Sequence, residues 1–501
     1  MKKFIYAALA VAAVLLFASC KNDKNQPKAE AGDAYVSFTF NLPQGGFRDG
    51  VADKNAKDEY AGTNAEQEIK AVRVVLYDPA SGAAKYAFDY NISTDAGTKL
   101  PTGEIAGTAT AAKFTTKARE VASKDYLMLA IINPTQKVKD ATAEGKTLLD
   151  AQVAVETSAT ELSAAGIMMS NEQGLVKVAP ANMKDAADAA EKAPVKVNVD
   201  RILAKVFVGT TATSGNPALP EDVTFTDIKW QLNTTNKKTF IYRQFGQVMA
   251  TKDNFVAEVA GDNSLRFNRY AQDPNFSGAF NADDFEYLVD VPTLSQEFGY
   301  ADANGQYCLE NTMEAASQKI QQTTSFILSG TWTPKGFTKG ETWYSYQGLP
   351  ISVAKMKDYI AEAKNPAKDA DQQIVGTPVG FKAALKAVLA MNDCPIADDG
   401  TIKKSFVAHE IKGYFKGVCY YQSNLIRHFN DDQSSASMGY GRYGVVRNNI
   451  YKINITKISQ PGEPTVVPDK DNPGKDDPSK VYVSFDVTIN PWIVRTQDIS
   501  L

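Results

Sequence analysis

The sequence predicts a mainly β protein made of two β-sandwich domains with a few short helices. Short apolar stretches separated by Gly, Pro and Asn turns recur along it; Val72–Tyr77, Asp78–Gly82 and Tyr86–Tyr90 together predict a strand, a turn and a second strand. The 501 residues are too many for one ordinary core, which favours more than one domain.

Further elements follow the same reasoning. Tyr126–Ile132 is a continuous apolar run ended by Asn133-Pro134, which predicts a strand buried on both faces. Residues 195–208 are β-like, and Asp227–Leu232 begins another strand that contains Trp230. Short helices are expected in Asn182–Lys192, Met356–Lys364 and Phe381–Met391.

Composition excludes few functions but favours some over others. The chain is 44% hydrophobic and 22% charged, with a net charge of −4 and no basic stripe, so we expect no nucleic-acid partner. The only histidines are His409 and His428, which disfavours histidine-based catalysis and metal binding. No Cys-x-x-Cys motif is formed by the cysteines at 308, 394 and 419. We expect buried free thiols; the alternative is a single internal disulfide between two of Cys308, Cys394 and Cys419.

No enzyme motif fits its required context. Gly439–Gly444 matches the dinucleotide-binding pattern, but the β-like stretch Val445–Ile455 follows it where a helix is needed. Acidic residues between Asp469 and Asp477 lack the spacing of a calcium loop. We therefore expect no catalytic residue, no cofactor and no metal site.

The N-terminus is typical of an export signal. Lys2 and Lys3 precede the apolar stretch Phe4–Ala18, which is shorter than the ~20 residues of a membrane span. Small residues then precede Cys20, so we expect cleavage before Cys20 and lipidation of its thiol. The alternative is a plain signal peptide with an incidental cysteine.

The C-terminus combines a proline-rich segment with an isolated strand. Pro461–Lys480 contains five prolines and many charges, which predicts an extended linker that reaches roughly 60 Å. The strand after it alternates apolar and polar residues, and its apolar positions, with the later Trp492, are Val481, Val483, Phe485, Val487 and Ile489. A single strand is unstable in water, so it must join an existing sheet.

The first strand of the chain is a chemical copy of this last strand. Tyr-Val-Ser-Phe occurs at 35–38 and again at 482–485, and the alternation continues in phase beyond both. The apolar positions of the first copy are Val36, Phe38, Phe40 and Leu42. We therefore expect both strands to fit the same groove.

A glycine-rich stretch, Gly45–Gly50, follows the first copy and contains Arg48. Such a loop is a favoured site for proteolysis, and a cut between Arg48 and Asp49 would release the first strand with the lipid. The groove would then accept the C-terminal strand of another subunit, and repetition builds an open filament. In the alternative, the C-terminal strand folds back on its own chain and leaves a monomer.

At these residues the sequence resembles the Bacteroidetes fimbrillins, or type V pilins, and among them the major shaft subunits of short (minor) fimbriae. The most specific matches are Val445–Tyr451, the Phe-Ala-Ser-Cys motif ending at Cys20, and Pro491-Trp492. The resemblance implies two transthyretin-like Greek-key β-sandwich domains, an extended C-terminal donor strand, and no enzymatic activity.

The resemblance also implies a route and a set of partners. The precursor would be exported as a lipoprotein to the outer membrane and trimmed by an arginine-specific surface protease, and the mature form would lie in extracellular fimbriae. Expected partners are identical subunits head to tail, anchor and tip fimbrial proteins, and host or bacterial surface receptors, in adhesion and biofilm formation. The competing hypothesis is a monomeric surface lipoprotein that binds glycan or host protein, with Tyr440 and Tyr443 as ligand platforms.

The expected organisation follows. A turn-rich stretch, Thr210–Glu221, predicts the boundary between the two sandwiches. The segments are a signal peptide (1–19), a lipidated propeptide with the first strand (20–48), an N-terminal sandwich (49–212), a C-terminal sandwich (213–460), a flexible linker (461–480) and a donor strand (481–501).

Overall fold

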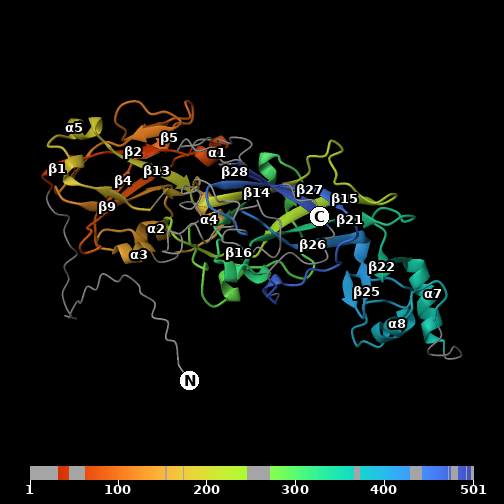
Figure 1. Cartoon of the computed structure of the whole chain (residues 1–501). Coiled ribbons are helices and arrows are strands. Elements are labelled where there is room, and N and C mark those ends of the chain that lie inside the picture. Colours follow the sequence, from red (N-terminus) through yellow and green to blue (C-terminus); the bar gives the residue numbers. More distant parts are fainter. Residues whose placement is uncertain are drawn as a thin grey trace, which may run out of the picture.

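The structure is a computed structural model that describes residues 32–43, 62–152, 155–172, 174–244, 271–365, 373–428, 443–471, 473–474, 483–491 and 494–497. The molecule is elongated, with an N-terminal β unit at one end, further sheets in the middle, and a small α/β module at the other end (Figure 1). It is mainly β with short helices, as predicted. None of the helices within these ranges has the length and apolarity that a membrane-spanning helix requires.

The N-terminal unit is built on one eight-stranded sheet. Its strands are β2 (Phe38–Asn41), β3 (Val72–Tyr77), β4 (Ala84–Tyr90), β7 (Lys113–Thr115), β9 (Tyr126–Ile132), β11 (Met169–Asn171), β12 (Val176–Val178) and β13 (Val195–Arg201). The order is β4-β3-β9-β11-β13-β2-β7, with β12 paired to β9. Two short pairs extend the unit: β1 (Ala34–Val36) with β8 (Arg119–Val121), and β5 (Ile92–Thr94) with β6 (Pro101–Gly103).

The central strand β9 is buried on both faces, as its continuous apolar run predicts. Met128 and Ala130 belong to the core that β2 and β13 share with β3 and β4. Leu129 and Ile131 belong to a second core on the opposite face. This core also contains Leu203, which begins the strand β14 (Leu203–Gly209). The helices that contribute to this second core are α2 (Gln136–Ala141), α3 (Leu148–Gln152) and α4 (Ala159–Ser163).

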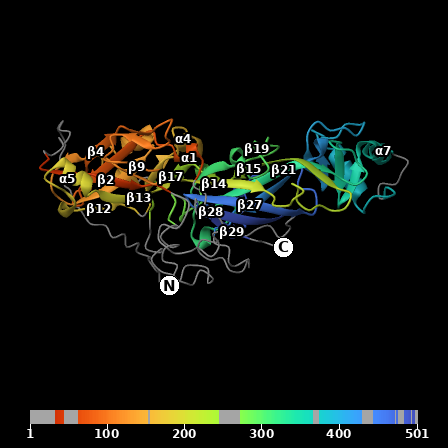
Figure 2. The same ribbon diagram turned by 90° about the horizontal axis from the view of Figure 1, so that it is seen from above.

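Two sheets form the middle of the molecule. Their strands are β14 (Leu203–Gly209), β15 (Thr224–Asn233), β19 (Gln296–Glu297), β20 (Gln306–Leu309), β21 (Ser325–Thr333), β26 (Val418–Leu425), β27 (Asn449–Ile458), β28 (Val483–Pro491) and β29 (Val494–Gln497). One sheet has the order β20-β14-β27-β28-β29 and the other β19-β15-β21-β26. The two sheets lie next to each other in the middle of the molecule (Figure 2). They share a core that includes Trp230, Leu328 and Ile453.

A small module is inserted between β21 and β26. It comprises β22 (Trp343–Tyr346), β23 (Leu349–Ser352), α7 (Val353–Lys364), α8 (Phe381–Leu389), β24 (Phe406–Ala408) and β25 (Ile411–Tyr414). Its own core includes Tyr344, Ile360 and Leu385. The predicted helices are confirmed here and, over a shorter range, at α5 (Ala187–Lys192).

Minor elements complete the described chain. Two short pairs are β10 (Val155–Glu156) with β17 (Lys238–Thr239) and β16 (Thr235–Asn236) with β18 (Phe285–Glu286). A short helix, α1 (Asn64–Gln67), precedes β3. Single 3₁₀ turns occur at Pro180–Asn182, Ala282–Asp284, Asp302–Asn304, Ala315–Ser317, Ile320–Gln322, Phe415–Gly417 and Asp469–Asp471.

The structure changes sheet earlier than the expected domain boundary. Residues 195–208 form two strands, β13 in the N-terminal sheet and β14 in the next, separated only by Ile202. The turn-rich stretch at 210–221 lies after β14, where it leads into β15. A local pattern of turn residues therefore marks a loop inside the second unit, whereas the change of sheet needs no loop.

The first half of the expected linker, residues 461–471, makes defined contacts with the rest of the chain. Glu463 pairs with Tyr420 of β26 through both backbone hydrogen bonds, and Val466 pairs with Asp290 in the same way. The buried carboxylate of Asp469 accepts a 2.8 Å hydrogen bond from Asn233. Prolines prevent a continuous ladder of backbone hydrogen bonds here. Isolated bridges and side-chain contacts provide hydrogen bonds for the backbone groups between the prolines.

Candidate strand-exchange site

The first strand lies inside the N-terminal sheet. β2 pairs in parallel with β13, where Phe40 lies opposite Val197. Its other edge pairs antiparallel with β7, and the Phe40 ring stacks on Phe114 with 4.8 Å between ring centroids. Loss of this strand would leave two unpaired strand edges facing each other across a slot.

The predicted first strand is divided into β1, which ends at Val36, and β2, which is followed by Leu42. Its four apolar side chains face one core, as the alternation predicts. Val36, Phe38 and Phe40 have no exposed surface, and Leu42 is 7% exposed. At ~1.5–3 kcal/mol for each buried side chain, they contribute on the order of 6–12 kcal/mol before ordering costs. Any strand that replaces β2 must supply comparable apolar groups at the same spacing.

The polar face of the strand is also covered, which the alternation did not predict. Ser37 donates a 2.8 Å hydrogen bond to the carbonyl of Thr116. The hydroxyls of Thr39 and Thr115 are 2.7 Å apart. Asn41, which is partly exposed, donates a 2.9 Å hydrogen bond to Asn198. A replacement strand therefore needs small or polar residues at these positions.

The structure pairs the expected donor strand with its own chain. β28 lies antiparallel to β27, with Val487 opposite Ile453 and Ile489 opposite Tyr451. β29 pairs antiparallel with β28, so both strands belong to this sheet (Figure 2). This is the fold-back arrangement that the sequence left open as the alternative.

The two similar strands therefore occupy different sites in this structure. β2 lies in the N-terminal sheet beside β13, and β28 lies in a middle sheet beside β27. Alternation predicted that both strands join a sheet by one apolar face, but it did not predict which sheet the last strand joins within its own chain. The expected lipidation site Cys20, the cleavage site Arg48–Asp49, and Val481 and Trp492 lie outside the described residues.

A buried ion pair joins the segment after the first strand to the middle sheet. The Nζ atom of Lys205 in β14 lies 2.7 Å from Oε1 of Glu66 in α1, and the two side chains are 3% and 2% exposed. Tyr307 of β20 donates a 2.5 Å hydrogen bond to the same oxygen. Thr63 and Glu66 also form a capping box that fixes α1.

The pKa of Glu66 reflects two opposed effects. Burial raises the pKa, but the charge of Lys205 and hydrogen bonds from Lys205, Tyr307 and Thr63 outweigh burial, so the pKa is lowered. Glu66 is therefore ionised at neutral pH and holds α1 against the middle sheet.

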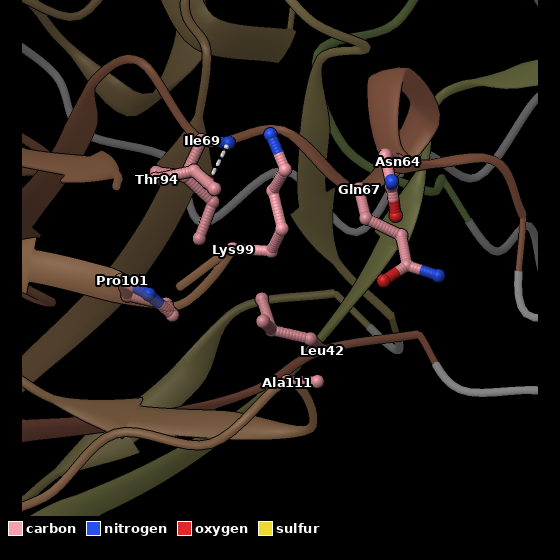
Figure 3. A pocket seen from close by; sticks show the side chains of 8 residues that line it. All are labelled: Leu42, Asn64, Gln67, Ile69, Thr94, Lys99, Pro101 and Ala111. Atoms are coloured by element: carbon pink, nitrogen blue, oxygen red, sulfur yellow. Dashed lines mark hydrogen bonds between the residues drawn. The ribbon is translucent and has the colours of Figure 1, made fainter. Parts of the chain in front are cut away.

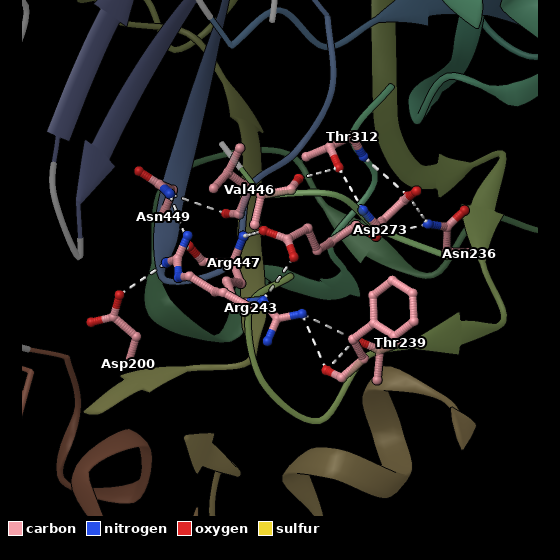
Figure 4. Close-up of polar contacts among 12 residues, drawn as sticks. Asp200, Asn236, Thr239, Arg243, Asp273, Thr312, Val446, Arg447 and Asn449 are labelled. Atoms are coloured by element: carbon pink, nitrogen blue, oxygen red, sulfur yellow. Dashed lines mark hydrogen bonds and ion pairs between the residues drawn. The ribbon is translucent and has the colours of Figure 1, made fainter. Parts of the chain in front are cut away.

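A second buried polar network lies where β13, β20 and the start of β27 meet (Figure 4). Arg447 and Glu310 form an ion pair with 2.8 Å between Nε and Oε2, and both side chains are 1% exposed. Arg243 pairs with Asp200 at 2.9 Å, and Asn448 donates a 2.9 Å hydrogen bond to the same carboxylate. Residues from both β units thus share one network.

This network explains the motif Val445–Tyr451 that carried the resemblance. Asn448 has a φ of +61°, a left-handed conformation that asparagine tolerates better than most residues. The Asn449 amide donates hydrogen bonds to the carbonyls of Val446 and Arg447, and the Tyr451 hydroxyl accepts one from the Val446 amide. The motif forms a tight corner that leads into β27.

Several other sequence candidates have structural roles. Tyr443 has no exposed surface and packs under Arg427, so it offers no ligand platform; Tyr440 lies outside the described residues. Cys308 and Cys419 are buried and Cys394 is half-buried, and none forms a disulfide. Among the described residues no group of His, Cys, Asp and Glu side chains has the arrangement of a metal site.

Comparison with known proteins identifies the family. Residues 34–201 match the family model of the major fimbrial subunit protein FimA, and residues 412–498 match that of the type IV major fimbrial subunit protein, fimbrillin, C-terminal. Two forms of the minor fimbrium subunit Mfa1 of Porphyromonas gingivalis are each 24% identical over 551 residues, covering 99% of both chains. The chain belongs to the Bacteroidetes fimbrillins.

Solved structures with similar coverage include two from this group of bacteria. A putative cell adhesion protein from Parabacteroides distasonis is 10% identical, with a TM-score of 0.43, and the match covers 94% of this chain and 99% of that one. A fimbrilin (FimA) from P. gingivalis W83 is 14% identical, with a TM-score of 0.40, and the match covers 94% and 100%. The two fimbrillin family models include β2 at one end of this chain and β28 and β29 at the other.

Proposed function

We propose that this fimbrillin is a structural subunit of a cell-surface fimbria whose subunits join by donor-strand exchange. In this proposal, cleavage between Arg48 and Asp49 releases the first strand, and the C-terminal strand of a neighbouring subunit takes its place. Family membership supports the role of fimbrial subunit. The joining mechanism rests on one observation: the buried first strand and the C-terminal strand carry the same pattern in phase.

The apolar half of that pattern fits the slot. With Tyr-Val-Ser-Phe aligned, Val483, Phe485, Val487 and Ile489 take the positions of Val36, Phe38, Phe40 and Leu42. All four of those positions are buried in the precursor. The residues at the first two positions are identical in the two strands. At the other two positions the donor has the β-branched residues Val487 and Ile489, which suit a strand.

The polar half of the pattern also fits. Asp486 takes the position of Thr39, which lies opposite Lys196 in the register of β13. Thr488 takes the position of Asn41, which lies opposite Lys113 of β7. Neighbours in register share a face of the sheet, so the acidic group of the donor would lie beside an exposed lysine.

The own-chain pairing of β28 favours a second candidate, a monomeric surface lipoprotein that binds glycan or host protein. In the fimbrial proposal the same pairing is a stored state, because the strand that will join a neighbour is kept in a sheet until assembly. A stored strand also has no free edge that would promote aggregation. The burial of Tyr443 removes one argument for the ligand-binding alternative.

The remaining parts of the proposal concern the cell. Lipidation at Cys20 would carry the precursor to the outer membrane, and an arginine-specific surface protease would cut after Arg48. The chain would then act as the shaft subunit of a short fimbria, with anchor and tip fimbrial proteins as further partners. Binding to host or bacterial receptors would support adhesion and biofilm formation.

The test compares two single substitutions in the donor strand. Val487→Asp places a carboxylate at the fully buried position of Phe40, at a cost of several kcal/mol when unpaired. Thr488→Asp places the same group at the partly exposed position of Asn41, opposite Lys113. Each full-length precursor is cut with an arginine-specific protease, and polymers are measured as SDS-resistant ladders and by filament length.

We expect Val487→Asp to abolish ladders and Thr488→Asp to retain them, with both precursors folded by circular dichroism. Equal behaviour of the two variants would show that the register or the face is wrong. A separate variant is truncated after Lys480. If this variant and Val487→Asp both formed normal ladders, strand exchange would be eliminated and the monomeric lipoprotein would be favoured.

A further inference from the structure

A small hollow lies at the end of the first strand (Figure 3). Its floor is apolar, with Leu42, Ile69 and Pro101, all of which are buried. Its rim is polar, with Asn64 and Gln67 from α1 and Lys99 from the turn before β6. An apolar floor with a few polar groups at the rim is typical of a site that receives a side chain or small ligand.

The walls of the hollow are held by defined contacts. The Ile69 amide donates a 2.8 Å hydrogen bond to the Thr94 hydroxyl, which ties the segment after α1 to β5. The buried pair of Glu66 and Lys205 fixes α1 itself. None of these residues belongs to the released segment except Leu42, so the hollow would persist after cleavage and widen where Leu42 leaves.

The register of strand exchange gives this hollow an occupant. Ile489 of the donor takes the position of Leu42, and two residues later the donor carries Pro491-Trp492. At ~3.3 Å per residue, Trp492 starts about 10 Å beyond Ile489, past the end of the slot where Leu42 lines the hollow. The proline has no amide hydrogen to continue a ladder, so the donor can turn there.

We infer that Trp492 of one subunit docks over this hollow on the next, so that Pro491-Trp492 locks the end of the donor strand. The hollow has a volume of about 30 Å³, which holds one edge of the indole after Ile489 has filled the place of Leu42. The ring face then lies against Pro101 and the Lys99 side chain, where a cation–π contact is favourable. This inference rests on the proposed donor-strand exchange.

The experiment uses the full-length chain with Trp492→p-benzoylphenylalanine, a photoreactive residue that keeps an aromatic ring. Precursors with the probe are mixed with ¹⁵N-labelled precursors without it, cut with an arginine-specific protease, polymerised and irradiated. Cross-linked peptides are identified by mass spectrometry, and the label distinguishes adducts between subunits from adducts within one. Thr488→p-benzoylphenylalanine serves as the matched probe of the strand register.

We expect the probe at 492 to label residues 64–69 or 94–101 of the neighbouring subunit, and the probe at 488 to label β7 near Lys113. If the probe at 488 labelled β7 but the probe at 492 labelled no residue of the hollow, the docking of Trp492 would be overturned and strand exchange would stand. Absence of any adduct between subunits from either probe in polymers would contradict strand exchange itself.

A substitution series gives an independent measure. Trp492→Ala should make polymers dissociate about tenfold faster in heated SDS, equivalent to ~1.4 kcal/mol, whereas Trp492→Phe should change the rate less. Pro101→Gly should reproduce much of the loss, and Lys177→Ala, an exposed change on β12 outside both the slot and the hollow, should not. Equal dissociation rates for Trp492→Ala and the native chain would contradict the docking.

Discussion

The ion pair between Glu66 and Lys205 gives the sharpest prediction about the cohesion of the molecule. It joins α1 of the N-terminal unit to β14 of the middle sheet, and both side chains are almost fully buried. Lys205→Ala would leave a buried carboxylate without its cation, which typically costs ~3–5 kcal/mol. The variant also loses the contacts of the ammonium group with the rings of Phe207 and Tyr307.

The effect should depend on pH in a defined direction. The lowered pKa of Glu66 gives the native protein stability above the ordinary carboxyl pKa near 4.5, and this stability is lost as the pH falls through the native value. Without Lys205, burial would raise the pKa of Glu66 and the group would take up a proton more easily. The difference between the native chain and Lys205→Ala should therefore be large at pH 7 and smaller at pH 4.

The assay is urea denaturation followed by circular dichroism, because the N-terminal unit lacks tryptophan. Lys335→Ala is the matched control, since its ion pair with Asp222 is exposed, at 77% and 53%, and should contribute less than ~1 kcal/mol. Glu66→Gln with Lys205→Met should recover much of the stability, because no unpaired charge remains. Equal losses for Lys205→Ala and Lys335→Ala would refute the structural role of this pair.

Three further predictions follow from other parts of the chain. Burial raises the pKa of Asp273 to about 7 despite hydrogen bonds from Asn236 and Thr312. The native state therefore loses stability as the pH rises from about 4 to about 7, because the unfolded chain releases this proton more easily. Asp273→Asn should flatten that part of the profile of stability in urea against pH. Arg48→Ala should fold normally but fail to polymerise, because the first strand stays in its slot; normal filament yield would show that this cleavage is dispensable. Cys20→Ala should block lipidation and surface display, measured by metabolic labelling with palmitate, and normal fimbriae would exclude the lipoprotein route.

Local patterns in the sequence predicted local structure well. β3 and β9 occur at the predicted residues, because a run of apolar residues with turn signals on both sides specifies a strand without reference to the rest of the chain. α7 also forms close to its predicted range, with the Ser352 hydroxyl accepting a hydrogen bond from the Lys355 amide at its start.

Contacts between residues and strands that are far apart in the sequence could not be predicted from local patterns. Glu66 and Tyr307 are 241 positions apart, and neither stands out from other charged or aromatic residues. Alternation specifies which face of β28 is apolar but not whether its partner is β27 or a neighbouring subunit. Proline content predicted a linker at 461–480, whereas within residues 461–471 Glu463 forms a backbone bridge to Tyr420 and Val466 forms one to Asp290.

The N-terminal residue of the subunit in surface filaments tests the account most directly. Filaments would be sheared from cells and dissociated, and the subunit would be analysed by intact-mass and N-terminal peptide mass spectrometry. Donor-strand exchange triggered by cleavage predicts that the mature chain starts at Asp49, with the first strand absent. A filament subunit that starts at lipidated Cys20 and retains Val36 to Leu42 would contradict the account.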